Sequence, residues 1–158
     1  MQKTILLTGA TDGIGLEAAK MLLEQGHTVL LHGRNPTKLA NVEAMLAALP
    51  HHGRTESYIA DLSRMADVEA MVRAVAAQHT KLDVLVNNAG VFRTAHTITQ
   101  DGLDVRFVVN TIAPYLLMQR LLPLMDASGR VVNLSSAAQA PVNLKALLGQ
   151  VRLTDDFQ

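Results

Sequence analysis

The sequence predicts an α/β fold in which a doubly wound parallel sheet lies between two layers of helices, and three observations support this. Short apolar runs bounded by turn residues recur along the chain, as expected of strands buried on both faces of a parallel sheet. Stretches with apolar residues at helical spacing separate these runs. Strand and helix alternate throughout, and right-handed crossovers leave few topologies for such a pattern. We therefore expect three layers, αβα, with the strand order 3-2-1-4-5.

The predicted elements follow one another without an internal repeat or a flexible linker. Residues 39–49 and 68–75 have the apolar spacing of crossover helices, and a longer helix is predicted from Asn110 through Leu121. The predicted strands cover residues 5–7, 28–31, 57–59, 82–86 and 131–134.

Length and composition indicate a single domain over residues 1–158, 49% hydrophobic and 18% charged. The absence of cysteine excludes disulfides, zinc-thiolate sites and thiol nucleophiles, and it fits a reducing cytoplasm. Fourteen Lys and Arg balance 14 Asp and Glu, so no basic field attracts nucleic acid or an anionic membrane. The apolar run that ends at Gly9 is too short to span a membrane. We expect a cytoplasmic protein with neither kind of partner.

A glycine-rich turn, TGATDGIG, occupies residues 8–15 directly after the first predicted strand. Its glycines permit a tight turn, close approach of the backbone to a pyrophosphate, and close packing of helix on strand. The following helix offers free N–H groups and a positive dipole to an anion, so amides near Gly13 and Gly15 are the expected anchor. A turn without a ligand is the alternative, but the strand and helix around it favour a Rossmann-like dinucleotide site. The helix is expected to bury an apolar face made of Ile14, Ala18, Met21 and Leu22.

The end of the second predicted strand indicates which dinucleotide is bound. Eighteen positions after Gly15, Gly33 and Arg34 stand where an acidic residue would bind the ribose 2′-hydroxyl of NAD. Arg34, followed by Asn35, suits a 2′-phosphate, because a guanidinium binds phosphate bidentately with a bond worth roughly 1.5–3 kcal/mol. The sequence therefore predicts NADP(H) in preference to NAD(H). The alternative is a solvated arginine at the start of a loop before Pro36.

Three more motifs follow the glycine turn in order: ADL at 60–62, NNAG at 87–90 and VVNLSS at 131–136. With these motifs, and with Val109-Asn110 between the last two, the chain resembles the short-chain dehydrogenase/reductase family over nearly its whole length. The glycine spacing 9, 13, 15 is similar to that of the single-domain reductases rather than the extended, epimerase-type branch. The resemblance implies hydride transfer between NADP(H) and a small carbonyl or secondary alcohol substrate. It also implies pairing of subunits through the Asn110 helix.

The resemblance further implies roles for individual cofactor-binding residues. Asp61 would accept a hydrogen bond from the adenine amino group and Leu62 would donate one from its backbone, although Asp61 also suits a helix cap or turn. Asn87 could tie the turn after the fourth strand, and Ala89 and Gly90 allow close approach to the cofactor ribose; a purely structural turn is the alternative. The candidate cofactor-binding residues are Thr8, Gly9, Thr11, Asp12, Gly13, Ile14, Gly15, Arg34, Asn35, Asp61, Leu62, Asn88, Ala89 and Gly90.

Two polar residues are the candidate active-site residues. Ser136 matches the family's serine that hydrogen-bonds the substrate oxygen, with a serine that satisfies the strand backbone as the alternative. Asn110 looks like the family's active-site asparagine. Pro114, four residues later, has no N–H to give the Asn110 carbonyl, so we expect a helix kink with a carbonyl available to a water. The alternative is a kink that only fits the helix over the sheet.

The family's chemistry also needs a tyrosine followed four residues later by a lysine, which lowers the pKa of the tyrosine and holds the ribose. Neither Tyr58 nor Tyr115 has such a lysine, and the last lysine, Lys145, has Pro141 at the corresponding position. We expect residues 136–158 to form a loop leading to a missing Tyr-x-x-x-Lys helix, and the fifth strand to be a sheet edge. As printed, the chain is then an inactive part of a longer reductase. The alternative is a non-catalytic NADP(H)-binding or interaction module.

Other chemistry finds no support in the sequence. The six histidines show no spacing typical of a metal site, and a solvated turn after Pro50 is expected for His51-His52. The glycine turn lacks the Gly-Lys-Ser/Thr ending of a P-loop, which argues against hydrolysis of a nucleoside triphosphate.

Overall fold

A computed structural model describes residues 1–50, 53–136, 143–148 and 150–151 of the chain. In it five parallel strands form one sheet in the order β3-β2-β1-β4-β5, which confirms the predicted doubly wound α/β fold. The strands are β1 (Thr4–Leu7), β2 (Thr28–Gly33), β3 (Arg54–Ile59), β4 (Val84–Asn87) and β5 (Arg130–Asn133). The α-helices are α1 (Gly13–Glu24), α2 (Pro36–Ala47), α3 (Met65–Gln78), α4 (Val105–Phe107), α5 (Ala113–Leu121) and α6 (Leu144–Leu147).

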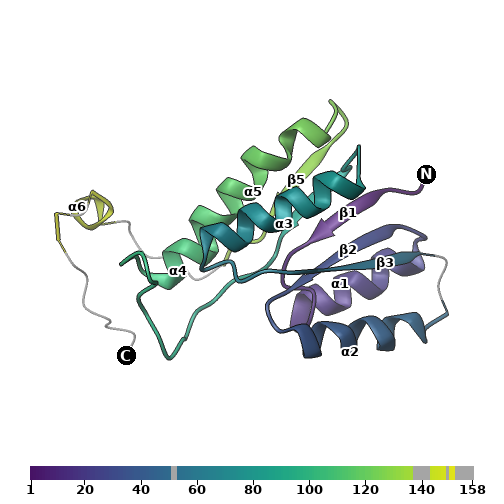
Figure 1. Ribbon diagram of the computed structural model, residues 1–158, viewed down its shortest axis with the longest axis horizontal. Helices are drawn as coiled ribbons and strands as arrows, with labels where there is room; N and C mark the ends of the chain where they lie inside the picture. Colours follow the sequence, from purple (N-terminus) through teal and green to yellow (C-terminus); the bar gives the residue numbers. More distant parts are fainter. Residues whose placement is uncertain (51–52, 137–142, 149, 152–158) are drawn as a thin grey trace.

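Helices cover both faces of the sheet, as the three-layer prediction requires (Figure 1). Helices α1 and α2 pack over an apolar cluster that includes Leu7 and Leu31. On the opposite face, α3 and α5 pack over a cluster that includes Leu6 and Leu30. Because successive side chains of a strand point to opposite faces, adjacent leucines of β1 and of β2 fall in different clusters.

The two outer strands differ from the prediction that every strand is buried on both faces. On β3 Tyr58 is buried while its neighbour Ile59 is exposed, and on β5 Val132 is exposed. Each of these strands has one partner strand among the described residues, so less of the sheet and fewer helices cover it. Among the described residues β5 lies at a sheet edge, as expected for the fifth strand.

The predicted apolar face of α1 is wrong at Ile14 and Met21. Ile14 is 72% exposed and Met21 is 61% exposed. The helix instead approaches the sheet through a glycine, because a β-carbon on Gly15 would lie only 2.1 Å from the Gly9 carbonyl oxygen. Close contact at this point fixes the rotation of the helix, whatever the size of the neighbouring apolar side chains. The residues of α1 that face the core are Gly15, Ala18, Ala19, Leu22 and Leu23.

The predicted long helix is a continuous helical stretch, Val105–Leu124, which packs against α3. Between α4 and α5 it contains a π-helical segment, η1 (Val108–Ile112), and it ends in a 3-10 turn, η2 (Leu122–Leu124). The Ala113 N–H bonds the Val108 carbonyl five residues earlier, directly before Pro114. The helix is therefore irregular where the proline predicts a kink. A water at the Asn110 carbonyl stays a prediction.

The same stretch is long and apolar enough to cross a membrane by length and composition, with 20 residues and a mean hydropathy of 1.2. Its inner side nevertheless lies in the core, where Val109, Ala113 and Leu117 are buried. Core helices of globular domains pass the same test of length and hydropathy, so this property alone does not indicate a membrane span.

The tail after β5 differs from the predicted continuous loop, because α6 forms a single helical turn there. It lies away from the three layers (Figure 1). The remaining predictions for the tail fall largely on residues 137–142, 149 and 152–158, and the predicted turn falls on His51-His52. All of these lie outside the described residues.

Candidate functional site

The carboxyl ends of the strands surround a cavity of about 650 Å³. It lies where the chain order reverses between β1 and β4, the position at which open α/β sheets bind their ligands. The cavity brings together most of the residues predicted to bind the cofactor. Those that line it are Gly9, Thr11, Asp12, Ile14, Gly15, Arg34, Asn35, Asp61, Leu62, Asn88, Ala89 and Gly90.

Thr8 supports this cavity from behind. It is buried, and its Oγ1 donates to the Val86 carbonyl at 3.2 Å while accepting from the backbone N–H groups of Asn88 and Ala89, both at 3.0 Å. These bonds hold the glycine turn against the end of β4. Direct contact of Thr8 with a dinucleotide stays a prediction.

The glycine turn and the loop after β4 are also joined through Asn88, whose Nδ2 donates to the carbonyls of Thr8 at 2.8 Å and Gly9 at 3.1 Å. Gly9 has a positive φ of 67°, and a β-carbon there would lie 2.9 Å from the Cα of Ala89. The side-chain hydrogen bonds predicted for Asn87 at the turn after β4 are therefore made by Asn88. Asn87 instead joins two strands, because its Nδ2 donates to Asn133 Oδ1 at 2.8 Å.

The start of α1 offers backbone amides to an anion. The Gly13 N–H is already used, since it donates to Asp12 Oδ1 at 2.8 Å. Within the described part of the chain, the N–H groups of Ile14 and Gly15 have no acceptor. They lie in the first turn of a 12-residue helix, where the dipole is positive. The anchor predicted near Gly13 and Gly15 is thus available at Ile14 and Gly15.

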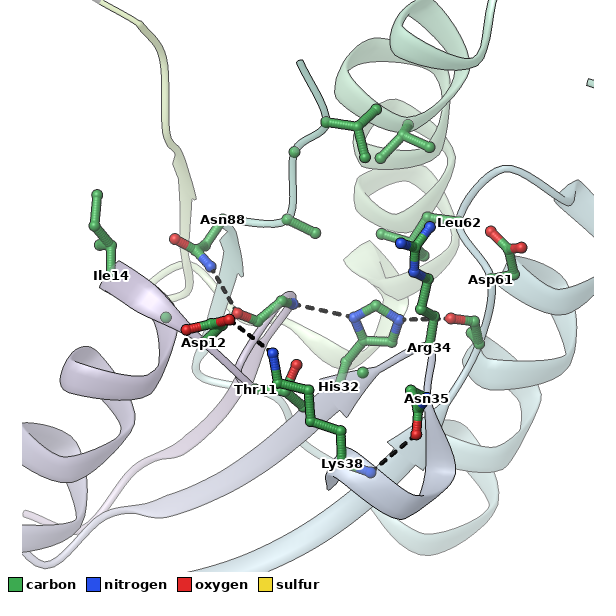
Figure 2. A pocket seen from close by; sticks show the side chains of 18 residues that line it. Thr11, Asp12, Ile14, His32, Arg34, Asn35, Lys38, Asp61, Leu62 and Asn88 are labelled. Atoms are coloured by element: carbon green, nitrogen blue, oxygen red, sulfur yellow. Dashed lines mark hydrogen bonds and ion pairs between the residues drawn. The ribbon is translucent and has the colours of Figure 1, made fainter. Parts of the chain in front are cut away.

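His32 lies beneath the turn, and sequence reasoning gave it no role (Figure 2). It is 3% exposed, its Nδ1 accepts from the Gly9 N–H at 3.2 Å, and its Nε2 bonds the Ala60 carbonyl at 3.1 Å. Both partners are satisfied only when the ring is neutral with its hydrogen on Nε2. Burial lowers the pKa of His32, which favours this form. The available signal was a polar residue inside a buried strand, next to a glycine turn.

Two cations line the wall formed by the end of β2 and the start of α2. Arg34 is exposed and makes no ion pair with any described residue. Asn35 caps α2, because its Oδ1 accepts from the Lys38 N–H at 2.9 Å. The Lys38 Nζ lies 2.7 Å from Asp12 Oδ2, and this contact lowers the pKa of Asp12. Sequence reasoning missed Lys38, since its position depends on the N-cap and on a partner 26 residues away.

Asp61 forms a turn after β3. Its Oδ1 accepts from the N–H and the Oγ of Ser63, at 2.9 and 2.8 Å. The N-cap of α3 is Arg64, so of the two structural alternatives Asp61 takes the turn and not the cap. Its Oδ2 has no partner among the described residues, and the adenine-binding role remains compatible with this geometry.

A second cavity of about 660 Å³ adjoins the first and shares residues 88–91 with it. Ser135, Ser136, Asn110 and Tyr115 all line this cavity. The structure therefore brings both predicted active-site residues to one place. The two cavities adjoin each other, and together they extend from the glycine turn to the end of β5.

The Asn110 side chain fixes the wall between the two cavities. Its Oδ1 accepts from the Val91 N–H at 2.8 Å, and its Nδ2 donates to the Val91 carbonyl at 2.9 Å. The oxygen and the nitrogen of the Asn110 side-chain amide thus both bond the backbone of one residue, Val91. In this arrangement Asn110 positions the loop after β4.

Asn87 leaves an acceptor unsatisfied at the wall of the second cavity. The side chain is 5% exposed, and within the described residues its Oδ1 has no hydrogen-bond partner. Buried polar atoms rarely lack a partner, so a donor from a bound group or a water is expected there. In the described part of the chain no group of three or more acidic or histidine side chains is placed to hold a metal.

Comparison with known proteins shows the family of this chain. The family model for short chain dehydrogenases matches residues 3–146. The chloroplastic short-chain dehydrogenase TIC 32 A of Brassica napus is 37% identical over 143 residues, which cover 85% of this chain and 44% of that protein. Retinol dehydrogenase 13 of Homo sapiens is 34% identical over 140 residues, which cover 86% of this chain and 42% of that protein. This chain thus spans less than half the length of either relative.

A solved structure extends the comparison to three dimensions. The crystal structure of a metagenomic short-chain oxidoreductase in complex with NADP has a TM-score of 0.75 and 38% identity. The match covers 89% of this chain and 65% of that one. The sheet order fits these matches, and the chain belongs to the short chain dehydrogenase family.

Proposed function

We propose that the whole protein is an NADP(H)-dependent oxidoreductase that transfers hydride between nicotinamide and a carbonyl or secondary alcohol. The observation that carries this proposal is the pair of adjoining cavities, with the glycine turn in the first and Ser136 and Asn110 in the second. The NADP bound in the related metagenomic oxidoreductase supports the same cofactor class.

The residues present fit such a cofactor. The amides of Ile14 and Gly15 would bind its pyrophosphate, and Asp61 Oδ2 its adenine amino group. Arg34, which has no ion-pair partner among the described residues, would bind its 2′-phosphate. Asn87 Oδ1, which has no partner within the described part of the chain, would accept from a donor in the cavity that would hold the nicotinamide end.

At the reacting end, the bound nicotinamide nucleotide supplies or accepts the hydride, and the protein orients it. Ser136 would hydrogen-bond the substrate oxygen, because it lines the second cavity at the end of β5. Asn110 would keep the loop after β4 in place through its two bonds to Val91. The printed residues contain no tyrosine followed four positions later by a lysine, so the activity is proposed for the whole protein.

Binding of NADPH and NADH, followed by nucleotide fluorescence, tests the proposal. Arg34→Met should weaken NADPH about ten- to a hundred-fold and leave NADH nearly unchanged, because one charge-assisted contact to the 2′-phosphate is lost. Arg54→Met is the matched control. Arg54 is an exposed arginine at the first position of β3, so it lies away from the carboxyl ends of the strands that surround the cavity. An unchanged NADPH/NADH ratio in Arg34→Met would exclude the preference. Failure of both nucleotides to bind at millimolar concentration would exclude the site.

A non-catalytic NADP(H)-binding module is the second candidate, because the printed sequence has no tyrosine after Ser136. Reading the coding sequence beyond Gln158, or measuring the intact mass of the natural protein, separates the two. A Tyr-x-x-x-Lys soon after Gln158 supports the oxidoreductase. A stop codon at that point supports the module.

Pairing of two copies through the helical stretch 105–124 is part of the proposal. Tyr115 and Leu122 leave apolar surface exposed on this stretch. Light scattering of the natural protein and of its Leu122→Glu variant tests the pairing. A dimer that the substitution converts to monomer supports it, and a dimer that survives the substitution contradicts it.

A further inference from the structure

A second cation faces the same cavity as Arg34. Lys38 lies in the first turn of α2 and extends to Asp12 on the glycine turn, so the ion pair crosses from the β2 side of the cavity to the β1 side. Figure 2 shows Lys38 directed toward Asp12 and Arg34 directed toward the side where Leu62 lies. The two cations therefore reach different parts of the rim of this cavity, which we call its mouth.

Close packing holds the two sides of this mouth together. A β-carbon on Gly33 would lie 2.6 Å from Thr11 Cγ2, so the end of β2 rests directly on the glycine turn. The Asn35 cap fixes the backbone of Lys38 at the start of α2. The backbone is therefore anchored on both sides, and only the long Lys38 side chain has to move to reach a new partner.

The charge of Asp12 opposes a phosphate at this place. Its side chain is 81% exposed, that of Lys38 is 48% exposed, and both line the cavity. Exposed ion pairs are weak, and a phosphate monoester carries a charge of about −1.5 to −2 where a carboxylate carries −1, so the phosphate attracts the Lys38 ammonium group more strongly than Asp12 does. A phosphate that enters beside Arg34 can thus draw Lys38 away from Asp12.

We propose that Lys38 is a second ligand for the 2′-phosphate of NADP(H), and that Asp12 competes with this phosphate for the Lys38 ammonium group. Lys38 then raises the selectivity for the 2′-phosphate and Asp12 lowers it. This inference rests on the proposed function, because it assigns a further residue to the same site.

Two small probes isolate the contact from hydride transfer and from the nicotinamide. Adenosine 2′,5′-bisphosphate and 5′-AMP differ only in the 2′-phosphate, and titration calorimetry measures their affinities for the chain. Lys38→Met should weaken the bisphosphate about ten-fold and change 5′-AMP less than about two-fold. Asp12→Asn should tighten the bisphosphate and leave 5′-AMP unchanged; asparagine keeps the oxygen that accepts from the Gly13 N–H.

The double variant decides whether Lys38 acts directly or only neutralises Asp12. If Lys38 contacts the phosphate, Lys38→Met should still weaken the bisphosphate about ten-fold in the Asp12→Asn background. If it has no effect in that background, the proposal is overturned. Lys20→Met is the matched control, because Lys20 pairs with Glu17 on α1 and does not line the cavity; it should change neither affinity. Unfolding midpoints should agree among all variants, since every altered side chain reaches solvent.

The outcomes separate this inference from the proposed function. If neither probe binds the unaltered chain, both the proposed function and the role of Lys38 are overturned. If both bind equally and Arg34→Met has no effect, the 2′-phosphate preference falls, and the role of Lys38 falls with it. If Arg34→Met weakens the bisphosphate but Lys38→Met in the Asp12→Asn background does not, only the role of Lys38 is overturned.

Discussion

A β-carbon on Gly15 would lie 2.1 Å from the carbonyl oxygen of Gly9, closer than any packing of the turn can accommodate. Gly15→Ala should therefore push the glycine turn away from α1 and remove nucleotide binding. Gly13→Ala is the matched comparison, because a β-carbon there would meet no atom within 4 Å and only its φ of +51° is strained. That strain should lower the free energy of unfolding by roughly 1–2 kcal/mol. Urea unfolding and NADPH titration measure both effects; wild-type affinity in Gly15→Ala would contradict the close contact.

The pH dependence of stability should reveal the buried histidine. Because burial lowers the pKa of His32 below its usual 6.5, the unfolded chain takes up a proton that the folded chain does not. The contribution of His32 to the free energy of unfolding is thus complete above about pH 6.5 and decreases as the pH falls below this value. His32→Gln should be less stable at pH 8 by roughly 1–3 kcal/mol, because it breaks buried hydrogen bonds.

The distinguishing result is the slope between pH 8 and pH 5.5. Urea unfolding of His32→Gln should show a flatter profile than the unaltered chain over this range, because the variant has no group that titrates at this position. His96→Gln, which alters an exposed histidine, should keep the original slope. Parallel profiles for His32→Gln and the unaltered chain would show that His32 is not held neutral by the fold.

Sequence periodicity predicted the sheet order and the layers because strand and helix alternate clearly, but it could not predict how far each strand is covered. Burial depends on what packs from outside the strand, so Ile59 and Val132 are exposed although they are apolar. In the same way, the contact of Gly15 with Gly9 rotates α1 and leaves Ile14 exposed. Local pattern fixes the element, and tertiary contacts fix the face it buries.

The candidate site was predicted where it depends on short motifs, as for the glycine turn and the loop after β4. It was missed where a role arises between segments far apart in the chain. His32 acts on Gly9, 23 residues earlier, and Lys38 acts on Asp12, 26 residues earlier. No spacing rule within one element reveals such pairs, since the parallel crossover brings them together.

Alkaline pH should destabilise the fold through Tyr58. Burial, with the nearby Glu56 carboxylate, raises the pKa of Tyr58 to about 12, and the Tyr58 hydroxyl donates to Glu56 Oε2 at 3.2 Å. The unfolded chain therefore loses this proton first, and stability present below about pH 10 is lost as the pH rises toward 12. Tyr58→Phe should flatten urea unfolding profiles between pH 9 and 11. Tyr115→Phe, which alters an exposed tyrosine, should not.

Removing the Asn110 amide should loosen the wall between the two cavities. Asn110→Ala loses both hydrogen bonds to Val91, and at roughly 1 kcal/mol for such a contact the Val91 amide should exchange about five-fold faster. Asn110→Asp keeps the oxygen that accepts from the Val91 N–H and loses the donor, so its exchange rate should lie between the two. Hydrogen exchange with mass spectrometry measures these rates. Gln119→Ala on the same helix is the control, because Gln119 bonds only Tyr115 among the described residues.

The affinity for NADPH should follow the same order, because the loop held by Asn110 lines both halves of the proposed cofactor site. A purely local effect would instead speed Val91 exchange while leaving NADPH affinity unchanged in Asn110→Ala. That combination would show that the loop after β4 moves independently of the cofactor site. Val91 exchange that is unchanged in Asn110→Ala would contradict the positioning role assigned to Asn110.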